Sequence, residues 1–332
     1  MSLRGVAGLV GLCVLGLATG CGDDVPAAPV EEASGGAGAP LDAEAAALVG
    51  QALEAMRARR WEDVAPLLQP LLARPAPPPD ATWIAGSAAF ELGRYDEAIE
   101  RLDDAVRRKP EFLPNAAALG FARREVGDFA GAEATFQQIL AVRPQAYKAH
   151  YGLGLVALDQ GRLPEARREL EAALAIEPKY LKAHAALGRL LFEEGRLADA
   201  RAELEAVADA WPGNEQALYL LAQVQSALGD QPAADATLAR RAQVYATKEQ
   251  LGALAARRRA GATSAAEYAR EVSLHLEIGE ASEAARTLAL GLRAHPGAPE
   301  LTVLIDSGML VPGAGDAADG PDATDGEPEG QR

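Results

Sequence analysis

Four histidines, two cysteines and several adjacent carboxylates are the residues of this 332-residue chain whose side chains could hold a metal or act on a substrate. His150 and His184 stand 34 residues apart, which would place them on neighbouring helices. No cysteine, and no nearby histidine or carboxylate four residues away, completes a zinc ligand set. We therefore expect both histidines to pack near the starts of their helices and predict no metal site.

The other patterns that could support catalysis are incomplete. Asp103-Asp104 and Glu193-Glu194 are carboxylate pairs of a kind that any acidic helical surface supplies. A Gly-x-Gly at 152–154 lies within a helical pattern and follows no strand, and the chain has no GxSxG, phosphate loop or Cys–His arrangement. The basic run 257–259 could meet lipid headgroups or an acidic partner, although a solvated helix end is favoured. The sequence thus predicts a protein that is not an enzyme and has no cofactor.

The N-terminal 21 residues read as an export signal. Arg4 precedes an apolar run from 5 to 20 that is too short to span a membrane comfortably. The run ends in Leu-Ala-Thr-Gly before Cys21, which resembles the lipobox of bacterial lipoproteins, with Ala18 where leucine is usual. The resemblance implies that Cys21 is lipidated after cleavage. Cleavage without lipidation is the alternative.

Lipidation would also account for the two cysteines. Cys13 cannot be the processed residue, because Leu12 before it is too large for the cleavage site, and it would be removed with the signal. Cys21 would be blocked, so the mature chain would have neither a free thiol nor a disulfide. Gly22 after the cysteine resembles outer-membrane sorting, so we expect a lipid-anchored protein of the bacterial envelope facing the periplasm. Asp23 leaves the inner membrane as an alternative.

The charge is concentrated at the two ends of the chain. The formal net charge is −16, but six acids lie in 22–44 and six more in 312–332, so the middle retains only about −6. Such a surface argues against nucleic acid, whose phosphates require a basic face. The two acidic segments read as a flexible linker and a disordered tail.

The middle of the chain repeats every 34 residues. In frames that start at 45, 79, 113, 147, 181 and 215, place fifteen is glycine in five frames (Gly93, Gly127, Gly161, Gly195, Gly229) and place twenty is alanine in the same five. Glycine can adopt φ > 0 and end a first helix, and alanine lets the second helix pack closely on the first. Proline at place thirty-two stops the second helix in four frames. A period of this length indicates stacked helix pairs.

The frame 79–112 closely resembles the tetratricopeptide-repeat consensus. The resemblance implies an all-α, right-handed superhelix of about seven helix-pair repeats. The expected division is a signal at 1–21, a linker at 22–44, six repeats at 45–248, a helical extension and turn at 249–264, a seventh repeat at 265–298, a capping helix at 299–311 and the tail at 312–332.

In tetratricopeptide proteins, places two, five, nine, twelve and thirteen of the first helix line a concave groove. Transferred to this chain, the resemblance implies a partner-binding groove with aromatic anchors and basic residues. Its predicted members are Trp83, Phe90, Phe121, Arg124, Lys148, Tyr151, Lys182, Arg189, Phe192 and Tyr219. Aromatic side chains and arginine carry much of the energy of protein interfaces, although some of these aromatics could pack against neighbouring helices instead. The clamp for chaperone C-termini needs Lys and Asn at places five and nine, and neither is present.

These features predict a membrane-anchored, non-enzymatic scaffold or adaptor of the bacterial cell envelope. Its groove would bind segments of other envelope proteins, during assembly of pilus, outer-membrane or cell-wall complexes. The alternative is a structural protein that associates with itself as a homodimer, through the first repeat or the 249–264 extension.

Overall fold

The computed structural model describes residues 41–57, 59–261 and 263–306, and their regular structure is entirely helical. The all-α prediction is therefore confirmed for these residues. The predicted signal segment with Cys21, the linker up to 40, the end of the capping helix beyond 306 and the acidic tail lie outside them. None of the described helices is both long and apolar enough to cross a membrane.

Fifteen α-helices and one 3-10 helix make up the described part of the chain. The first eight α-helices are α1 (Ala43–Arg57), α2 (Trp61–Leu72), α3 (Pro79–Glu91), α4 (Tyr95–Arg108), α5 (Ala117–Glu125), α6 (Phe129–Val142), α7 (Tyr147–Asp159) and α8 (Leu163–Ile176). They are followed by α9 (Leu181–Glu193), α10 (Leu197–Ala210), α11 (Glu215–Ala227), α12 (Gln231–Arg259), α13 (Ala265–Glu277), α14 (Ala281–Ala294) and α15 (Pro299–Asp306). The 3-10 helix η1 (Pro110–Asn115) precedes α5.

The repeated glycines end the first helices as predicted. Gly93, Gly127, Gly161, Gly195 and Gly229 all have φ between 70° and 82°, the left-handed region in which glycine carries no Cβ penalty. The alanines five residues later are buried in all five pairs. Arg59 occupies the glycine place of the first pair and is the one non-glycine residue with positive φ in the described ranges, at 50°. The first pair thus keeps the turn without the glycine.

The second to fifth helix pairs cross closely because a glycine faces a large side chain at the crossing. The Phe136 ring of α6 lies between Gly120 on α5 and Gly152 on α7, and a Cβ on Gly120 would lie 2.6 Å from that ring. Leu170 of α8 fills the equivalent position against Gly154. The place-eight glycines therefore set the distance between the two helices of a pair.

The third pair departs from the predicted register. Its first helix was expected from 113 but begins at Ala117, after η1. Pro110 and Pro114 lie in this segment, and proline cannot donate the backbone hydrogen bond that an α-helix requires. η1 carries the buried Phe112, whose ring centroid lies 5.0 Å from that of Trp83. The linker prediction also ends slightly late, because Ala43 and Glu44 already belong to α1.

The helix α12 has 29 residues and supports two other helices in succession. The helix α11 lies along the part of α12 that reaches to Lys248, where Thr237 donates to Gln225 at 2.8 Å and the Lys248 ammonium is 3.0 Å from the Glu215 carboxylate. Because Gln225 ends α11 and Glu215 begins it, the two helices are antiparallel.

The helix α13 lies along α12 from Gln243 to its C-terminal end, also antiparallel. Gln243 donates to Glu277 at 3.1 Å and Arg270 donates to Gln250 at 3.2 Å. The end of α13 therefore meets the start of α11, and a Cβ on Gly213 would lie 2.7 Å from the Ile278 carbonyl oxygen. The helices α11 and α13 thus follow one another along α12.

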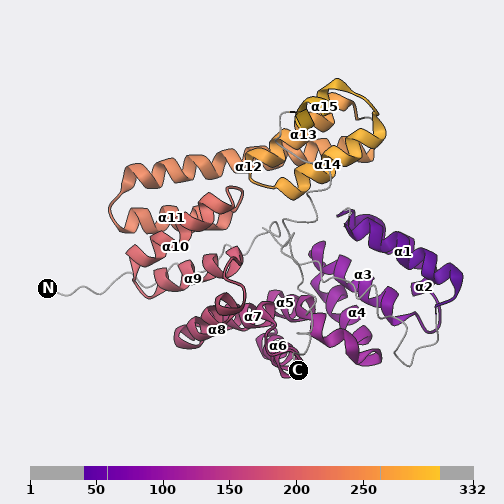
Figure 1. Ribbon diagram of the computed structural model, residues 1–332. Coiled ribbons are helices and arrows are strands. Elements are labelled where there is room, and N and C mark those ends of the chain that lie inside the picture. Colours follow the sequence, from indigo (N-terminus) through magenta and orange to yellow (C-terminus); the bar gives the residue numbers. More distant parts are fainter. Residues whose placement is uncertain (1–40, 58, 262, 307–332) are drawn as a thin grey trace, which may run out of the picture.

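The array curves back on itself. In Figure 1 the helix pairs run from α1 through α5–α8 to α11, and α12 then returns towards the first pair. The Arg259 guanidinium at the end of α12 lies 2.5 Å from the Glu62 carboxylate at the start of α2. Arg257 and Arg258 pair with Glu267 and Glu271 of α13, so the basic run 257–259 forms ion pairs within the chain.

Candidate partner-binding groove

Three of the predicted groove aromatics belong to the core. Trp83, Phe90 and Phe121 are buried. Besides the contact of Trp83 with Phe112, Phe90 packs on Tyr95 with ring centroids 5.9 Å apart, and Phe121 packs on Phe136 at 5.1 Å. The prediction that these three are accessible anchors is therefore corrected, because each fills a space between neighbouring helices.

Three other predicted aromatics keep accessible surface. Tyr151 of α7 is half-buried, with its ring 5.8 Å from Phe121 and 5.1 Å from Tyr180. Phe192 of α9 is also half-buried. Tyr219 of α11 is 42% exposed, and the Arg241 guanidinium lies 5.2 Å from its ring centroid. These side chains are held by their neighbours and still expose part of each ring.

The predicted arginines share one carboxylate. Arg124 of α5 donates through Nε to Asp159 of α7 at 2.7 Å, and Arg189 of α9 donates to the other oxygen of Asp159 at 3.1 Å. Arg124 also contacts Glu125 at 2.7 Å, and Arg189 contacts Glu193 at 2.9 Å. We call Glu125, Arg124, Asp159, Arg189 and Glu193 the ion ladder. It joins the first helices of three consecutive pairs.

The ion ladder stabilises the charged form of Arg189. Burial disfavours the charged guanidinium of Arg189, but hydrogen bonds to Asp159 and Glu193 outweigh it, so the pKa of Arg189 is raised. The side chains of Arg124 and Asp159 are about one-fifth exposed. A partner carboxylate must therefore share or displace Asp159 to reach these arginines.

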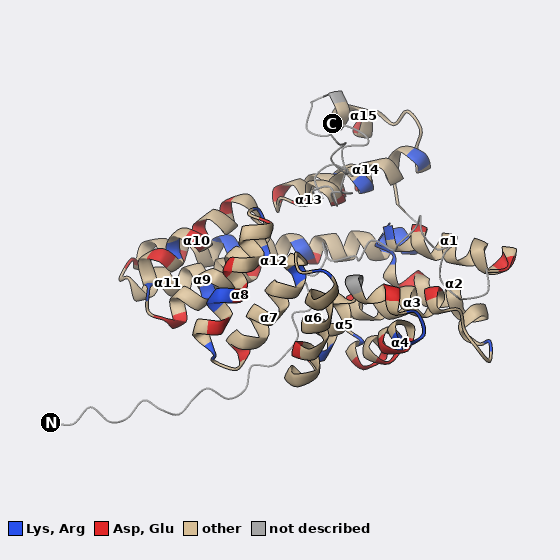
Figure 2. Cartoon of the chain, turned by 60° about the horizontal axis from the view of Figure 1, so that its bottom comes forward, with Lys and Arg blue, Asp and Glu red and all other residues tan. Residues whose placement is uncertain are grey.

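Lys148 and Lys182, the remaining predicted members, lie at the second residues of α7 and α9. Both are half-buried, and the Lys148 ammonium is 5.9 Å from the Tyr147 ring centroid. Acidic and basic residues are interspersed over the helices of the array rather than separated onto two faces (Figure 2).

His150 and His184 do not face each other. Nδ1 of His150 lies 2.8 Å from Glu169, and Nδ1 of His184 lies 2.8 Å from Glu203, so each histidine meets the second helix of its own pair. The sequence carried a signal for these contacts, because a glutamate recurs at place twenty-three in both frames. No group of three metal-ligating side chains occurs in 41–57, 59–261 or 263–306.

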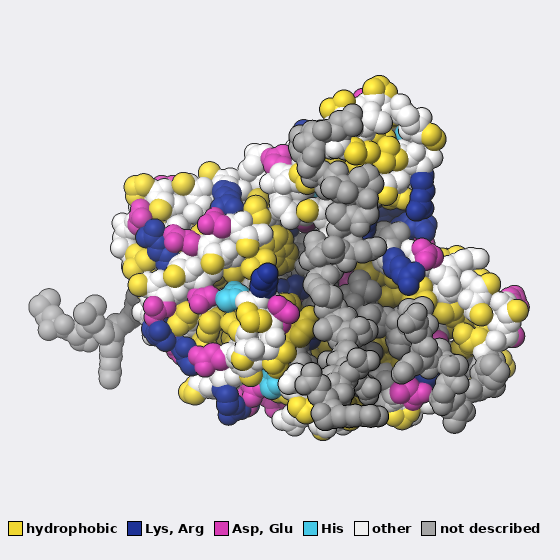
Figure 3. All heavy atoms as spheres, viewed as in Figure 1, with side chains coloured by type: hydrophobic (Ala, Val, Ile, Leu, Met, Phe, Trp, Pro, Cys, Tyr) yellow, Lys and Arg dark blue, Asp and Glu magenta, His cyan; other side chains and the backbone are white. Residues whose placement is uncertain are grey.

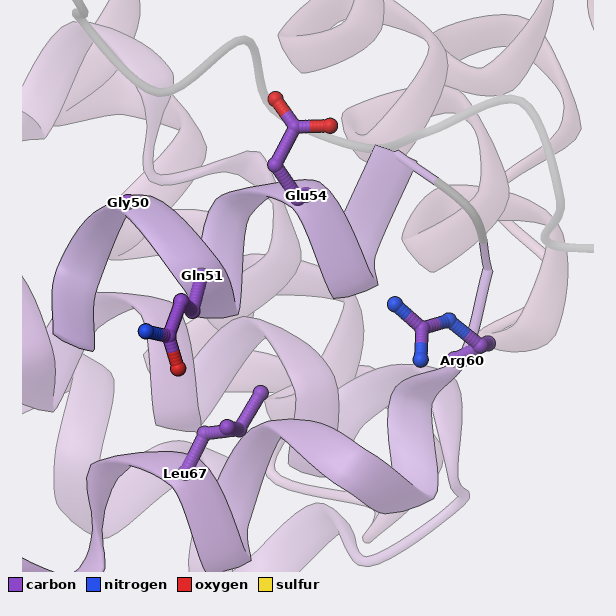
Figure 4. Close-up of a pocket in the computed structure, with 5 residues that line it drawn as sticks. All are labelled: Gly50, Gln51, Glu54, Arg60 and Leu67. Carbon is purple, nitrogen blue, oxygen red and sulfur yellow. The ribbon is translucent and has the colours of Figure 1, made fainter. Parts of the chain in front are cut away.

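A depression of about 570 Å³ lies between α1 and α2. Gly50, Gln51, Glu54, Arg60 and Leu67 line it, and in Figure 4 Glu54 points away from the side on which Gln51 and Leu67 meet. Arg60 pairs with Asp63 at 3.0 Å, and Glu54 pairs with Arg57 at 2.8 Å. These are local ion pairs of a helical surface, and the depression brings no nucleophile or acid–base pair together.

Two family models, each described as tetratricopeptide repeat, match the sequence. One matches 38–111 and 118–180, and the other matches 157–210 and 191–258, so together they cover more than half of the chain. No curated protein matches the chain.

Several solved structures resemble the chain at low sequence identity. The APC/C hetero-tetramer Cut9–Hcn1 is 12% identical with a TM-score of 0.51, over 78% of this chain and 48% of that chain. MamA of Desulfovibrio magneticus RS-1 is 20% identical with a TM-score of 0.43, over 50% of this chain and 94% of that chain. The pilF protein of Pseudomonas aeruginosa is 18% identical with a TM-score of 0.45, over 69% of this chain and 97% of that chain. The first of these likenesses supports the fold alone.

Proposed function

Because the chain belongs to the tetratricopeptide-repeat family, we propose that it is a non-enzymatic scaffold that binds segments of other proteins along the first helices of its pairs. The family is shown by the repeats, whereas function depends on the residues presented on them. The groove that we propose is smaller than the sequence suggested. It comprises Lys148, Tyr151, Lys182, Phe192, Tyr219 and the ion ladder.

The ion ladder is the observation that carries this proposal. It fixes two guanidinium groups, one on each side of Asp159 in the fourth helix pair, and Phe192 follows Arg189 by one helical turn. Arginines that are already ordered lose less conformational freedom when a partner binds. An aromatic ring beside an ordered arginine is the combination that dominates interface energies.

The occupant that fits this groove is a segment with acidic and apolar side chains. Its carboxylates would compete with Asp159 for Arg124 and Arg189, and its apolar side chains would cover Tyr151 and Phe192. The segment gains only the difference between its own contacts and those that Asp159 already makes. We therefore expect affinities in the micromolar range, about −8 kcal/mol, as for transient partners.

We further propose that the scaffold is attached to a bacterial envelope membrane through lipidated Cys21. We favour attachment to the outer membrane, with the protein facing the periplasm. Support for this step comes from the sequence of the first 21 residues, which lie outside the described part of the chain. Two or more acyl chains would anchor it stably, since each buried methylene contributes about 0.8 kcal/mol. The partners would then be envelope proteins, including those of pilus, outer-membrane or cell-wall assembly.

The test is affinity capture from envelope extracts with the full chain as bait. A groove variant carries Tyr151→Ala, Arg189→Ala and Phe192→Ala, and a control variant carries Arg168→Ala on the outer helix α8. Proteins held by the wild type and the control but lost by the groove variant would support the scaffold. Thermal unfolding of each bait must show that the groove variant is folded. Identical capture by all three baits would refute groove binding.

A further inference from the structure

One leucine of the repeat breaks the burial pattern of its equivalents. At place twenty-four, the residues Leu68, Leu102, Phe136, Leu170 and Leu204 are fully buried, and the equivalent Leu288 of the seventh pair is buried as well. Leu238, at the same place of the sixth pair, is 42% exposed. The sixth pair therefore lacks a contact that the other six described pairs have.

The sixth pair is also the exception to the burial pattern at place twenty-seven. Its other residues (Leu71, Ala105, Ile139, Ala173, Val207 and Gly291) are apolar or small and buried. The sixth pair has Arg241, whose buried Nε–H donates to no acceptor while its guanidinium lies against Tyr219. No carboxylate in the described ranges forms an ion pair with Arg241. Within the part of the chain that the structure describes, its charge therefore has no acidic partner.

The position of α13 explains both exceptions. In earlier pairs the large residue at place twenty-four packs between the first helix of its own pair and that of the next, as Phe136 does between Gly120 and Gly152. After the sixth pair, α12 continues to Arg259, and α13 lies beyond α11 on the same side of α12. The side of α12 on which the next first helix would stack is left open.

The open side of α12 carries interface residues. Leu238, Arg241 and Tyr245 follow one another at helical spacing, and Tyr245 is 52% exposed. Tyr219 on α11 adjoins them through its contact with Arg241. Figure 3 shows exposed apolar side chains among polar ones at the upper left, where α12 runs in Figure 1. We call Tyr219, Leu238, Arg241 and Tyr245 the α12 face.

We propose that the α12 face binds an amphipathic helix of a partner protein, which stacks on the sixth pair as a next first helix would and pairs a carboxylate with Arg241. Exposed tyrosines and an arginine suit a surface that is wetted when free and covered when bound. The unneutralised charge of Arg241 selects an acidic helix. The proposal is separate from the groove, with which it shares only Tyr219.

The geometry of earlier pairs fixes where the carboxylate must stand. Helices α6 and α7 are joined by the short connection 143–146 and therefore run antiparallel. Gly152 of α7 meets Phe136 at place twenty-four, so Ile139 at place twenty-seven faces the residues three or four positions before Gly152. By the same geometry the partner helix carries a small residue against Leu238. Its acid stands three or four residues before that small residue, in the pattern Glu-x-x-x-Gly.

The chain supplies its own probe for this pattern. In α7, Lys148 stands four residues before Gly152. The test uses two fluorescent peptides of residues 147–162, one natural and one with Lys148→Glu, titrated with the full chain and followed by anisotropy. We expect the Glu peptide to bind roughly tenfold more tightly than the Lys peptide, because replacing Lys148 by Glu turns the repulsion between the peptide and Arg241 into attraction. In the Arg241→Glu variant of the full chain the preference should reverse. The Leu238→Gln variant should bind both peptides more weakly.

Four outcomes would overturn the proposal. If neither peptide binds, the α12 face is not a binding site. If the Arg241→Glu variant still prefers the Glu peptide, Arg241 does not select the acidic helix. Binding that is lost in the groove variant but kept in Leu238→Gln places the peptide in the groove, which rejects this inference and leaves the proposed function intact. Concentration-dependent dimers in light scattering that are lost in Leu238→Gln would show that a second copy of the chain occupies the face instead. Leu238 is exposed and Arg241 is half-buried, so thermal unfolding checks that each variant is folded.

Discussion

The Nε atom of Arg59 lies 2.6 Å from Oε1 of Glu283, so the first helix pair and the seventh are joined directly although they stand at opposite ends of the array. Both side chains are about one-fifth exposed. With the pair between Arg259 and Glu62, this contact closes the curved array through charges rather than through an apolar interface. The Arg259–Glu62 pair is largely exposed, and such pairs contribute about 0–1 kcal/mol, so it adds little to the closure.

Removing the closing carboxylates should open the array. We expect the double variant Glu62→Ala, Glu283→Ala to have a larger radius of gyration in small-angle X-ray scattering. Wild-type protein in about 1 M salt should shift in the same direction, because the screening length falls to about 3 Å. Glu54→Ala, which removes only the exposed local pair with Arg57, is the control and should change nothing. Equal radii for all variants would show that the ends do not depend on these pairs.

A methyl group at the crossing of α5 and α6 should destabilise the protein. The Cβ of Gly120→Ala would overlap the Phe136 ring, which Gly152 blocks on its other side. We expect a loss of about 1–3 kcal/mol in the free energy of unfolding, measured in urea. Gly252→Ala is the matched control, since Gly252 lies in α12 with open space around it. That change should be neutral or stabilise by up to about 1 kcal/mol through helix propensity. A destabilising control and a neutral Gly120→Ala would contradict the crossing argument.

Acid should loosen the start of α13. The Ser264 backbone N–H donates to the Glu267 carboxylate, which lowers the pKa of Glu267 below its ordinary value of 4.5. The unfolded chain then binds the proton more readily, so the stabilisation is fully present above pH 4.5 and is lost as the pH falls below it. Glu267→Gln keeps a capping side chain without the titration. We expect the melting temperatures of wild type and Glu267→Gln to approach each other as the pH falls below 4.5. A constant difference would count against the role of Glu267.

Neutralising the shared carboxylate of the ion ladder should favour acidic ligands. In Asp159→Asn, Arg124 and Arg189 keep Glu125 and Glu193 but lose the partner between them. We expect a labelled glutamate-rich decapeptide to bind several-fold more tightly, as measured by anisotropy, because it no longer competes with Asp159. Asp209→Asn, at a highly exposed aspartate of α10, changes the net charge equally and is the control. Equal gains in both variants would mean that net charge alone is responsible.

Cys21→Ser should release the protein from the membrane. If Cys21 carries the acyl chains, the variant loses radioactive palmitate in metabolic labelling and moves from the membrane fraction to the soluble fraction. Cys13→Ser is the control and should be labelled like the wild type. A labelled Cys21→Ser variant would contradict the proposed anchor.

The helix pairs could be predicted from sequence because their signals are local. A glycine with positive φ, a small residue at a crossing and a proline after a helix act through their immediate neighbours, and they recur at a fixed period. The sequence indicated that α12 would continue, because Ala246 stands where earlier frames have proline. It could not indicate that α13 would follow α11 along α12, since that depends on contacts such as Gly213 with Ile278.

The groove was harder to predict because places of the repeat say which side of a helix a residue occupies but not what covers it. Trp83 is buried by Phe112, which belongs to the irregular η1 segment before the third pair. The sequence predicts that Arg124 and Arg189 are available to a partner, but both already donate hydrogen bonds to Asp159. The α12 face could not be predicted from sequence for the opposite reason. Leu238 follows the repeat, and only comparison of its burial with that of its equivalents reveals the difference.

The unbroken α12 has a consequence for how the protein unfolds. In a simple array each helix pair contacts only its neighbours, so pairs can fray one at a time from either end. The helix α12 contacts both α11 of the sixth pair and α13 of the seventh without an intervening turn. Unfolding that starts at α15 and reaches α13 therefore also removes contacts of the helix that supports α11. Hydrogen exchange should therefore report α11–α14 as one cooperative unit, with similar opening free energies for the amides of α11 and α13.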